Sequence, residues 1–406
     1  MDENTLIYDW NAQGAPRYQS MLHVADETLR DGLQSPSVID PPIDKKLEIL
    51  HLMVELGIHC ADIGLPGASE RQYRDVERLA REVVEQRLPL DLYVACRTLR
   101  SDIEPAVRVS AAVGRPIEVA AFLGSSPIRQ YAEGWTVDQL LKLTEEAVSY
   151  AVAEGLPVMY VTEDTTRADP ETLRRLYTLA VECGARRVCI SDTVGHATPE
   201  GTAALVGFVR EVVDATGEHV LVDWHGHRDR SLDIANCFAA YAAGADRTHG
   251  AALGIGERCG NTPIEVLLVN MKLAGMFDHD LAKLPEYGRV VSEALGVPIP
   301  VNYPVLGADA FRTATGVHAA AVIKAQHKGD DWLADRIYSG VPAGMIGRSQ
   351  LIEIGPMSGA SNVRFWLEQR GLPVSDEIIA AVIAAAKRSS KLLAEEEIRA
   401  IAGEEG

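Results

Sequence analysis

Apolar and polar positions alternate regularly along the first 274 residues. Short apolar runs, typical of buried strands, are each followed by a longer segment whose apolar residues recur at helical spacing. The predicted strands lie near residues 22–26, 59–63, 90–96, 116–123, 157–162, 187–191, 220–224 and 247–251. The predicted helices lie near residues 43–56, 70–86, 102–113, 136–154, 170–183, 199–215, 231–243 and 263–274. Eight such units predict an α/β fold, a (β/α)8 TIM barrel, with an open doubly wound sheet as the alternative.

The alternation ends after Ala274. Residues 275–310 are rich in proline and glycine and predict a linker with short helices. An alanine-rich run over residues 311–324 has helical spacing, and further helices are expected within 331–402. The domains predicted from this pattern are an N-terminal arm over residues 1–20, a TIM barrel over 21–274 and a mainly helical C-terminal region over 275–406.

The charge of the chain excludes two classes of partner. The 406 residues include 58 acidic and 39 basic side chains, which give a net charge of −19. Such a chain repels nucleic acid and anionic membrane surfaces, although local arginines can still bind a small anion. Six cysteines lack CxxC spacing and mostly lie in apolar runs, so we expect free thiols. Because no apolar run resembles a secretory leader or a membrane span, we predict a soluble cytoplasmic protein.

A polar cluster, DETLRDGLQ over residues 26–34, directly follows the first predicted strand. Catalytic groups collect at the carboxyl ends of strands in α/β folds. Arg30 places a permanent cation beside Asp31, whose carboxylate is a hard oxygen ligand, so the pair can hold a metal ion and neutralise an oxyanion. Taken alone, Arg-Asp-Gly is more often an exposed turn with a salt bridge, and its chemistry therefore depends on partners elsewhere.

Those partners follow the seventh and eighth predicted strands. His225 and His227 close the seventh strand, where residues two apart point to the same face and can bind one ion. After the eighth strand comes a glycine-rich loop over residues 254–261, which lacks the GxGxxG form of a dinucleotide site and ends in Asn261. One carboxylate, two imidazoles and an amide oxygen suit Mg²⁺, Mn²⁺ or Zn²⁺. Glu257, in the same loop, could orient a water or a histidine ligand.

Together these segments resemble a known family. DETLRDGLQ, the HGH of residues 225–227 and GIGERCGN over 254–261 are similar to motifs of the DRE-TIM metallolyases. TGVH over 315–318 and IYSGVP over 337–342 resemble the Claisen-condensing branch, which contains homocitrate, isopropylmalate, citramalate and Re-citrate synthases. The resemblance covers nearly the whole chain. It implies a metal-dependent acyltransferase that condenses acetyl-CoA with a 2-oxoacid.

The resemblance also implies roles for individual residues. The implied ligands of a divalent metal are Asp31, His225, His227 and Asn261. The implied catalytic residues are Arg30, Glu163, His318 and Tyr338. Among these, Arg30 would stabilise an oxyanion, Glu163 would lie near acetyl-CoA, and the other two would assist enolisation from a C-terminal lid. Gln34 and Thr193 match positions near the oxoacid. In relatives the lid can cap the partner subunit's barrel, which implies a homodimer.

The choice of oxoacid is predicted from the loops after the second, third and fourth strands. Leu65, Arg97, Ser125 and Ser126 are expected to form the pocket wall, and His196 is a further candidate for substrate contact. A guanidinium and two hydroxyls favour a diacid such as oxaloacetate or 2-oxoglutarate over 2-oxoisovalerate. Arg97 could equally form a salt bridge at the barrel rim.

Three alternative functions compete with this prediction. An isopropylmalate synthase proper would act on 2-oxoisovalerate. A lyase of the hydroxymethylglutaryl-CoA type would run the cleavage direction, but such enzymes usually lack a long C-terminal lid, so residues 275–406 argue against it. A ligand-binding sensor without turnover is disfavoured because the full set of implied catalytic residues is present. Departures from the family pattern at Asp62, Arg228 and Met357 affect the substrate more than the reaction class.

Overall fold

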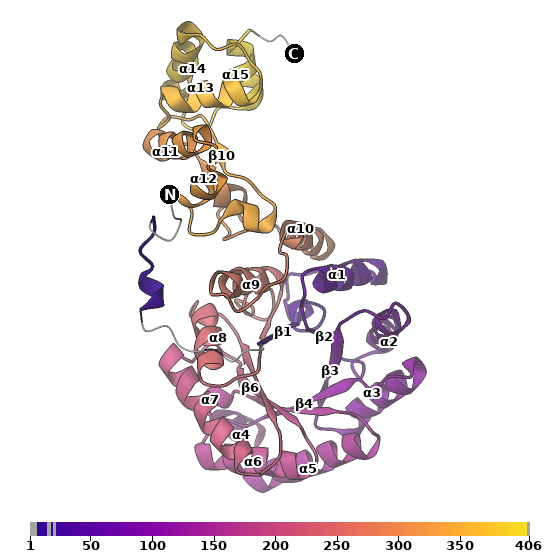
Figure 1. Ribbon diagram of the computed structural model, residues 1–406. Coiled ribbons are helices and arrows are strands. Elements are labelled where there is room, and N and C mark those ends of the chain that lie inside the picture. The colour runs from indigo at the N-terminus through magenta and orange to yellow at the C-terminus, as the bar shows by residue number, and fades with distance from the viewer. Residues whose placement is uncertain (1–5, 14–17, 19–21, 404–406) are drawn as a thin grey trace. The chain divides into compact units, whose positions relative to one another are not determined.

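The predicted strands form a closed barrel of parallel strands paired in chain order, with β1 hydrogen-bonded to β8 (Figure 1). The computed structural model describes residues 6–13, 18 and 22–403. The barrel strands are β1 (His23–Asp26), β2 (Cys60–Asp62), β3 (Asp91–Arg97), β4 (Glu118–Gly124), β5 (Val158–Glu163), β6 (Arg187–Asp192), β7 (Leu221–Gly226) and β8 (Arg247–Gly250). The (β/α)8 prediction is therefore confirmed.

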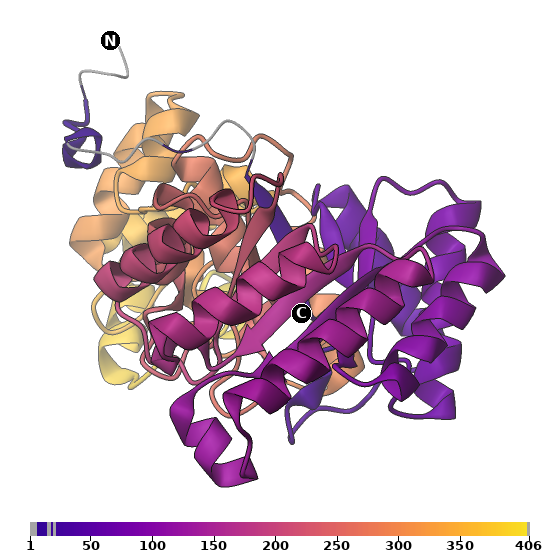
Figure 2. The same cartoon turned by 90° about the horizontal axis from the view of Figure 1, so that it is seen from below.

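Helices that follow the strands cover the outside of the barrel (Figure 2). They are α1 (Ile43–Glu55), α2 (Glu70–Glu85), α3 (Arg100–Val113), α4 (Pro127–Glu133), α5 (Val137–Ala153), α6 (Pro170–Glu182), α7 (Pro199–Asp214), α8 (Asp233–Ala242) and α9 (Ile264–Leu273). The side chains of Thr136, Asp169 and Thr198 accept hydrogen bonds from backbone amides in the first turns of α5, α6 and α7. The sequence pattern missed α4, a short helix that begins directly after Ser126.

The barrel interior has an apolar layer and, toward the carboxyl ends of the strands, a polar one. The apolar layer consists of Ala25, Cys60, Tyr93, Ala120, Met159 and Cys189. Several of these side chains are small, which leaves space along the barrel axis. The polar residues of the N-terminal motif, DETLRDGLQ, begin at the last residue of β1 and include the short helix η3 (Gly32–Gln34). The strand ends therefore present polar groups around that space.

The described chain divides into two compact units, Met1–His279 with Val290–Val297 and Asp280–Arg289 with Pro298–Gly406. This division passes through α10 (Leu284–Leu295), and the domain limits expected from the sequence stay a prediction. Of the expected N-terminal arm, residues 1–5, 14–17, 19 and 20 lie outside the described residues. No helix in the described ranges is long and apolar enough to cross a membrane.

The second unit has its own core. Its remaining elements are η6 (Ala308–Phe311), β9 (Arg312–Thr313), α11 (Gly316–His327), α12 (Asp331–Arg336), η7 (Ala343–Ile346), β10 (Leu351–Ile352), α13 (Ala360–Gln369), α14 (Asp376–Arg388) and α15 (Glu395–Ile401). Trp366, Leu367 and Val382 belong to an apolar cluster of α13, α14 and α15. The helix expected over 311–324 begins later, at Gly316, because residues 312–313 pair with β10 as a short parallel strand.

Candidate active site

One cavity of about 140 Å³ opens among the carboxyl ends of the barrel strands. The residues expected at the site that line it are Arg30, Asp31, Gln34, Leu65, Glu163, Thr193, His225, His227 and Glu257. They come from β5, β7 and the loops that follow β1, β2, β6, β7 and β8, so positions more than 200 residues apart in the chain meet at one place. Asn261 joins them through a hydrogen bond from its Nδ2 to Oδ1 of Asp31, 2.7 Å long.

Asp31, His225 and His227 form a buried group that can hold a metal ion. Each offers one ligand atom, and these atoms lie within 4.8 Å of one another. Two further buried atoms, Nδ1 of His227 and Oδ1 of Asn261, have no hydrogen-bond partner among the described residues. A buried polar atom without a partner is costly, and an ion would satisfy both. The residues present therefore fit a divalent cation with nitrogen and oxygen ligands.

The glycine-rich loop allows this close approach. Gly256 has a φ of +149°, and a Cβ at that position would overlap the side chain of Asn261 and lie 3.1 Å from Oδ1 of Asp31. A larger residue would push the loop away from the pair. Glycine at this position therefore makes room for the side chains of Asn261 and Asp31.

Arg30 is held by three carboxylates. Its Nε donates to Asp62 at 2.6 Å, its Nη1 to Asp31 at 2.9 Å and its Nη2 to Glu27 at 3.3 Å. Burial would lower the pKa of Arg30, but Asp62, Asp31 and Glu27 raise it well above the usual value, so the guanidinium stays charged. Burial also raises the pKa of Asp62 to about 6, against the opposing effect of Arg30. A fixed cation thus lies beside the metal-binding group.

Glu163 and Thr193 lie elsewhere in the cavity lining. Burial raises the pKa of the Glu163 carboxyl, while Arg129 and Arg30 oppose the shift. A carboxylate whose pKa moves toward neutrality is better suited to accept a proton at physiological pH. The hydroxyl of Thr193 accepts a hydrogen bond from the backbone amide of Asp164 at 2.8 Å, which leaves its own proton available to an acceptor in the cavity.

Four residues expected to contact substrate, Arg97, Ser125, Ser126 and His196, do not line the cavity. Arg97 forms a bidentate salt bridge with Asp102, at 2.6 and 2.9 Å, and its side chain is 60% exposed. Ser125 is fully buried, and its hydroxyl donates to the backbone oxygen of Glu163. His196 is exposed. Arg97 therefore forms a salt bridge, the alternative to substrate binding that the sequence also allowed.

His318 and Tyr338 belong to the second unit. Their rings are stacked with centroids 4.2 Å apart, and both side chains are exposed. The two residues assigned to a lid are therefore neighbours of one another, although 20 positions separate them in the chain.

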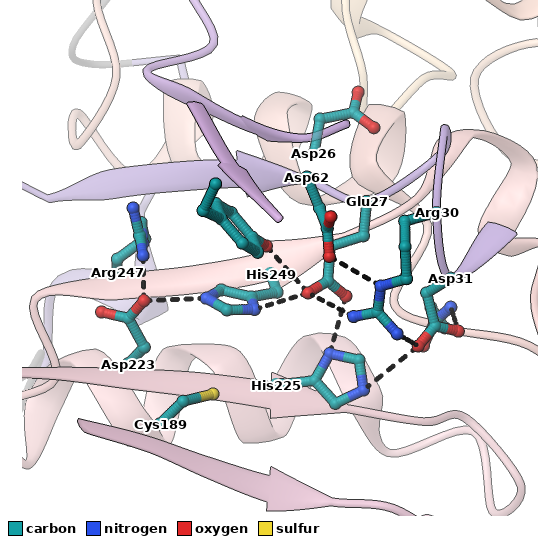
Figure 3. A network of polar contacts seen from close by, with 12 residues as sticks. Asp26, Glu27, Arg30, Asp31, Asp62, Cys189, Asp223, His225, Arg247 and His249 are labelled. Carbon is teal, nitrogen blue, oxygen red and sulfur yellow. Dashed lines mark hydrogen bonds and ion pairs between the residues drawn. The ribbon is translucent and has the colours of Figure 1, made fainter. Parts of the chain in front are cut away.

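A buried polar network that the sequence pattern did not predict lies beside the metal-binding group (Figure 3). Glu27 contacts His225 and His249, and Asp223 contacts His249 and Arg247. One signal was available. Asp223 precedes His225 by two residues on β7, so the alternation that places His225 inside the barrel also places Asp223 there.

The burial of Glu27 and Asp223 is offset by cations. Burial would raise the pKa of Glu27, but His225, His249 and Arg30 hold it well below its usual range. Burial would likewise raise the pKa of Asp223, and Arg187, Arg247 and His249 hold it below its usual range. Both side chains therefore remain carboxylates inside the barrel.

The sequence resembles curated relatives along most of its length. Residues 21–291 match the HMGL-like family. The homocitrate synthase AksA of Methanopyrus kandleri is 34% identical, over 89% of this chain and 85% of that protein. From the same organism, the putative (R)-citramalate synthase CimA is 32% identical, over 94% and 72%, and a probable 2-isopropylmalate synthase is 32% identical, over 89% and 68%.

A solved structure agrees on the fold. The hydroxymethylglutaryl-CoA lyase of Pseudomonas aeruginosa has a TM-score of 0.57 and 19% identity, and covers 68% of this chain and 93% of that chain. At this identity the likeness supports the barrel alone. The expectation of an enzyme is confirmed by the sequence relatives, which are named synthases. The chain belongs to the HMGL-like family, and its relatives there include synthases of the Claisen-condensing branch that its motifs indicated.

Proposed function

We propose that this protein is a metal-dependent acyltransferase that condenses acetyl-CoA with a 2-oxoacid and releases CoA. The observation that carries the proposal is the buried group Asp31, His225 and His227 with the Arg30 guanidinium beside it. This group lines a cavity at the carboxyl ends of the barrel strands, in a chain related to homocitrate, citramalate and isopropylmalate synthases.

The donor set supports a Lewis-acid role for a bound ion. Asp31, His225 and His227, with Asn261 as a further ligand, would hold a divalent cation that polarises the ketone of the oxoacid. Arg30 would stabilise the alkoxide that forms when the ketone carbon is attacked, an effect of about 3–4 kcal/mol. The Thr193 hydroxyl would donate to the oxoacid carboxylate, and Gln34 would contact the same substrate. The ion and Arg30 would thus act on the ketone of the oxoacid, whereas Thr193 would bind its carboxylate.

Proton removal from the acetyl methyl group needs a base. Glu163 is the carboxylate in the cavity lining whose raised pKa suits this task. His318 and Tyr338 would assist as lid residues. The resulting carbon nucleophile forms the new C–C bond with the ketone carbon, and water then cleaves the thioester to release CoA and a carboxylate. This hydrolysis drives the reaction toward the condensed product.

The remaining cavity wall favours an oxoacid with a small apolar side chain. Leu65, Ala95, Ala120, Phe122, Met159 and Val161 all line it. Among the described lining residues Arg30 is the only lysine or arginine, and all three of its nitrogens already contact carboxylates. A second substrate carboxylate would lack a cation and would meet Glu163 and Glu257. The diacid preference expected from the sequence depended on Arg97, which lies outside this lining.

A thiol-release assay tests the proposal. Acetyl-CoA would be supplied with pyruvate, 2-oxobutyrate, 2-oxoisovalerate, oxaloacetate or 2-oxoglutarate, each with and without EDTA. We expect CoA release that requires an oxoacid, stops with EDTA and is fastest with an aliphatic oxoacid. Release that is independent of any oxoacid would contradict the condensing function. Preference for a diacid would contradict only the proposal that the oxoacid has an apolar side chain.

A variant of the cavity wall sharpens the substrate assignment. Ala120→Val adds two methyl groups to the lining and should lower kcat/KM for 2-oxoisovalerate by roughly 10- to 100-fold relative to pyruvate, because the larger side chain loses its space. Ala106→Val, at a buried position of α3 outside the cavity lining, controls for the cost of overpacking. An equal loss for both oxoacids would contradict the assignment of this wall.

Cleavage of hydroxymethylglutaryl-CoA is the competing reaction, and release of acetoacetate from that thioester would favour it. The homodimer and the cytoplasmic location inferred from the sequence remain proposals. Sedimentation of the full chain tests the homodimer.

A further inference from the structure

Glu27 lies behind the metal-binding group and has no assigned part in the proposed chemistry. Its side chain is almost fully buried, and its two oxygens face different partners. Oε1 accepts from the Tyr93 hydroxyl at 2.8 Å, contacts Nδ1 of His249 at 2.9 Å and accepts from Arg30 at 3.3 Å. Oε2 lies 2.7 Å from Nδ1 of His225, at ion-pair distance, but outside hydrogen-bond geometry in the described residues. One oxygen is thus saturated, and the other faces a residue assigned as a metal ligand.

His249 is itself fixed on both sides. Its Nδ1 lies 2.9 Å from Oε1 of Glu27, and its Nε2 lies 2.9 Å from Oδ2 of Asp223. An imidazole that contacts a carboxylate through each nitrogen satisfies both contacts only when both nitrogens carry a proton. Asp223 is in turn held by Arg187 at 2.7 Å and by Arg247 at 2.6 Å. His249 is therefore locked between two anchored carboxylates.

The barrel backbone sets the spacing of this chain of charges. Asp223 and His225 lie two residues apart on the same face of β7, His249 lies on β8, and Glu27 directly follows β1, which pairs with β8. Tyr93 comes from β3. Groups that are anchored on strands keep their geometry better than groups on loops.

The ring of His225 lies between Glu27 and the metal-binding group. While its Nδ1 contacts Glu27, its Nε2 lies 3.9 Å from Oδ2 of Asp31. A carboxylate at Nδ1 requires a proton on that nitrogen and leaves the lone pair of Nε2 free for an ion, as is usual for histidine ligands.

We propose that Glu27, held by His249 and Tyr93, is a positioning residue that fixes the tautomer and ring orientation of His225, so that Nε2 is presented to the metal. This inference rests on the metal site of the proposed function. The neighbouring set Glu27, His225 and His249 also has the composition of a metal site. The proposal assigns it to hydrogen bonding instead, because Oε1 of Glu27 and both nitrogens of His249 already have partners.

Metal titration of the full-length, chelator-stripped protein tests this without any substrate. Calorimetry with Zn²⁺ and Co²⁺ would give affinity and stoichiometry, and the visible spectrum of the Co²⁺ form would report ligand geometry. Glu27→Gln keeps the size of the side chain but removes its charge. We expect one ion per chain in both proteins, about 10- to 100-fold weaker binding in the variant, and an altered Co²⁺ spectrum.

Glu118→Gln is the matched control. Glu118 is another partly buried carboxylate, paired with Arg187 and Arg247, but it makes no contact with His225. It should leave metal affinity and the Co²⁺ spectrum unchanged. Circular dichroism melting of the metal-free proteins separates a loss of fold from a loss of positioning. If Glu27→Gln does not fold, Tyr93→Phe removes one donor to Oε1 and should weaken binding in the same direction, by less.

Three outcomes would overturn the proposal. Affinity and spectrum in a folded Glu27→Gln that match the wild type would show that Glu27 does not position His225. Two ions in the wild type and one in the variant would make Glu27 a ligand. A wild type that binds no divalent ion would remove the metal site as well, whereas intact metal binding without CoA release would refute only the condensing function.

Discussion

Two groups of three neighbouring histidines, one toward each end of the barrel, differ in what surrounds them. Toward the carboxyl ends, His225, His227 and His249 lie among the carboxylates of Glu27, Asp31 and Asp223. At the opposite end, His23 and His59 stack with centroids 4.4 Å apart, and His279 meets His59 edge to face. Only the first set lines the cavity.

The surroundings decide what an imidazole does. Burial, together with the neighbouring His23, His279 and Arg247, lowers the pKa of His59 to about 4, so this ring stays neutral and packs as an aromatic group. At the other end burial would lower the pKa of His249, but Glu27 and Asp223 raise it. A buried histidine is thus a candidate for chemistry where carboxylates and a cavity face it, and a packing residue where other rings do.

The largest expected effect comes from exchanging one histidine at each end. His227→Ala should abolish CoA release, because a site with three or four ligands loses one of them and the ketone is no longer polarised. His59→Asn should leave kcat unchanged. Both are measured by thiol release, with circular dichroism melting as the control for folding. Full activity of a folded His227→Ala would contradict the comparison.

The buried ion pairs that Arg247 forms with Asp223 and Glu118 should stabilise the folded protein. Arg247 is buried and pairs with Asp223 at 2.6 Å and Glu118 at 3.3 Å. Arg247→Met should lower the free energy of unfolding by about 3–5 kcal/mol, because it leaves a buried charge uncompensated. The control is Arg115→Met, which breaks an exposed pair with Asp91 and should cost at most about 1 kcal/mol. Urea unfolding measures both losses. Equal losses would show that the buried ion pairs of Arg247 stabilise the protein no more than an exposed pair.

The histidine stack predicts a smaller, pH-dependent effect. The pKa of His59 is about 4 in the folded protein, whereas an unfolded histidine has one near 6.5, so the unfolded chain binds more protons between these values. Stability should therefore be full above pH about 6.5 and fall as the pH drops toward 4. His59→Gln should reduce this slope in urea midpoints, and exposed His219→Gln should not. Identical pH profiles for His59→Gln and the wild type would refute the assignment of this pH dependence to His59.

The smallest effect on activity is expected at the barrel rim. Arg97 lies at the carboxyl end of its strand, but it pairs with Asp102 and does not line the cavity. Arg97→Ala should leave the KM for the oxoacid unchanged and cost about 1 kcal/mol of stability through the lost salt bridge. A clear rise in KM for oxaloacetate or 2-oxoglutarate would restore the diacid preference expected from the sequence. That result would show that a residue at the carboxyl end of a barrel strand can bind the substrate even though it does not line the cavity.

The sequence by itself determined the barrel and the common location of the residues proposed as metal ligands. Periodicity identifies strands and helices because burial of one face repeats at a fixed spacing, and eight such units leave few architectures. His225 and His227 could be placed on one face for the same reason. Asp31 could be placed at the same end because all parallel strands of a closed barrel end together.

Only the tertiary structure decided which polar residues meet. Glu27 contacts His249, which lies 222 positions away, and no local pattern encodes that separation. The tertiary structure also showed that Arg97 pairs with Asp102 and that part of the cavity wall is supplied by apolar side chains such as Leu65, Phe122 and Val161. The physical reason is that a charged side chain at the end of a strand turns toward a nearby partner of opposite charge. Which partner is nearby depends on the three-dimensional packing of the chain. Periodicity reports which face of an element is buried, whereas the partners on that face depend on how the elements close into a barrel.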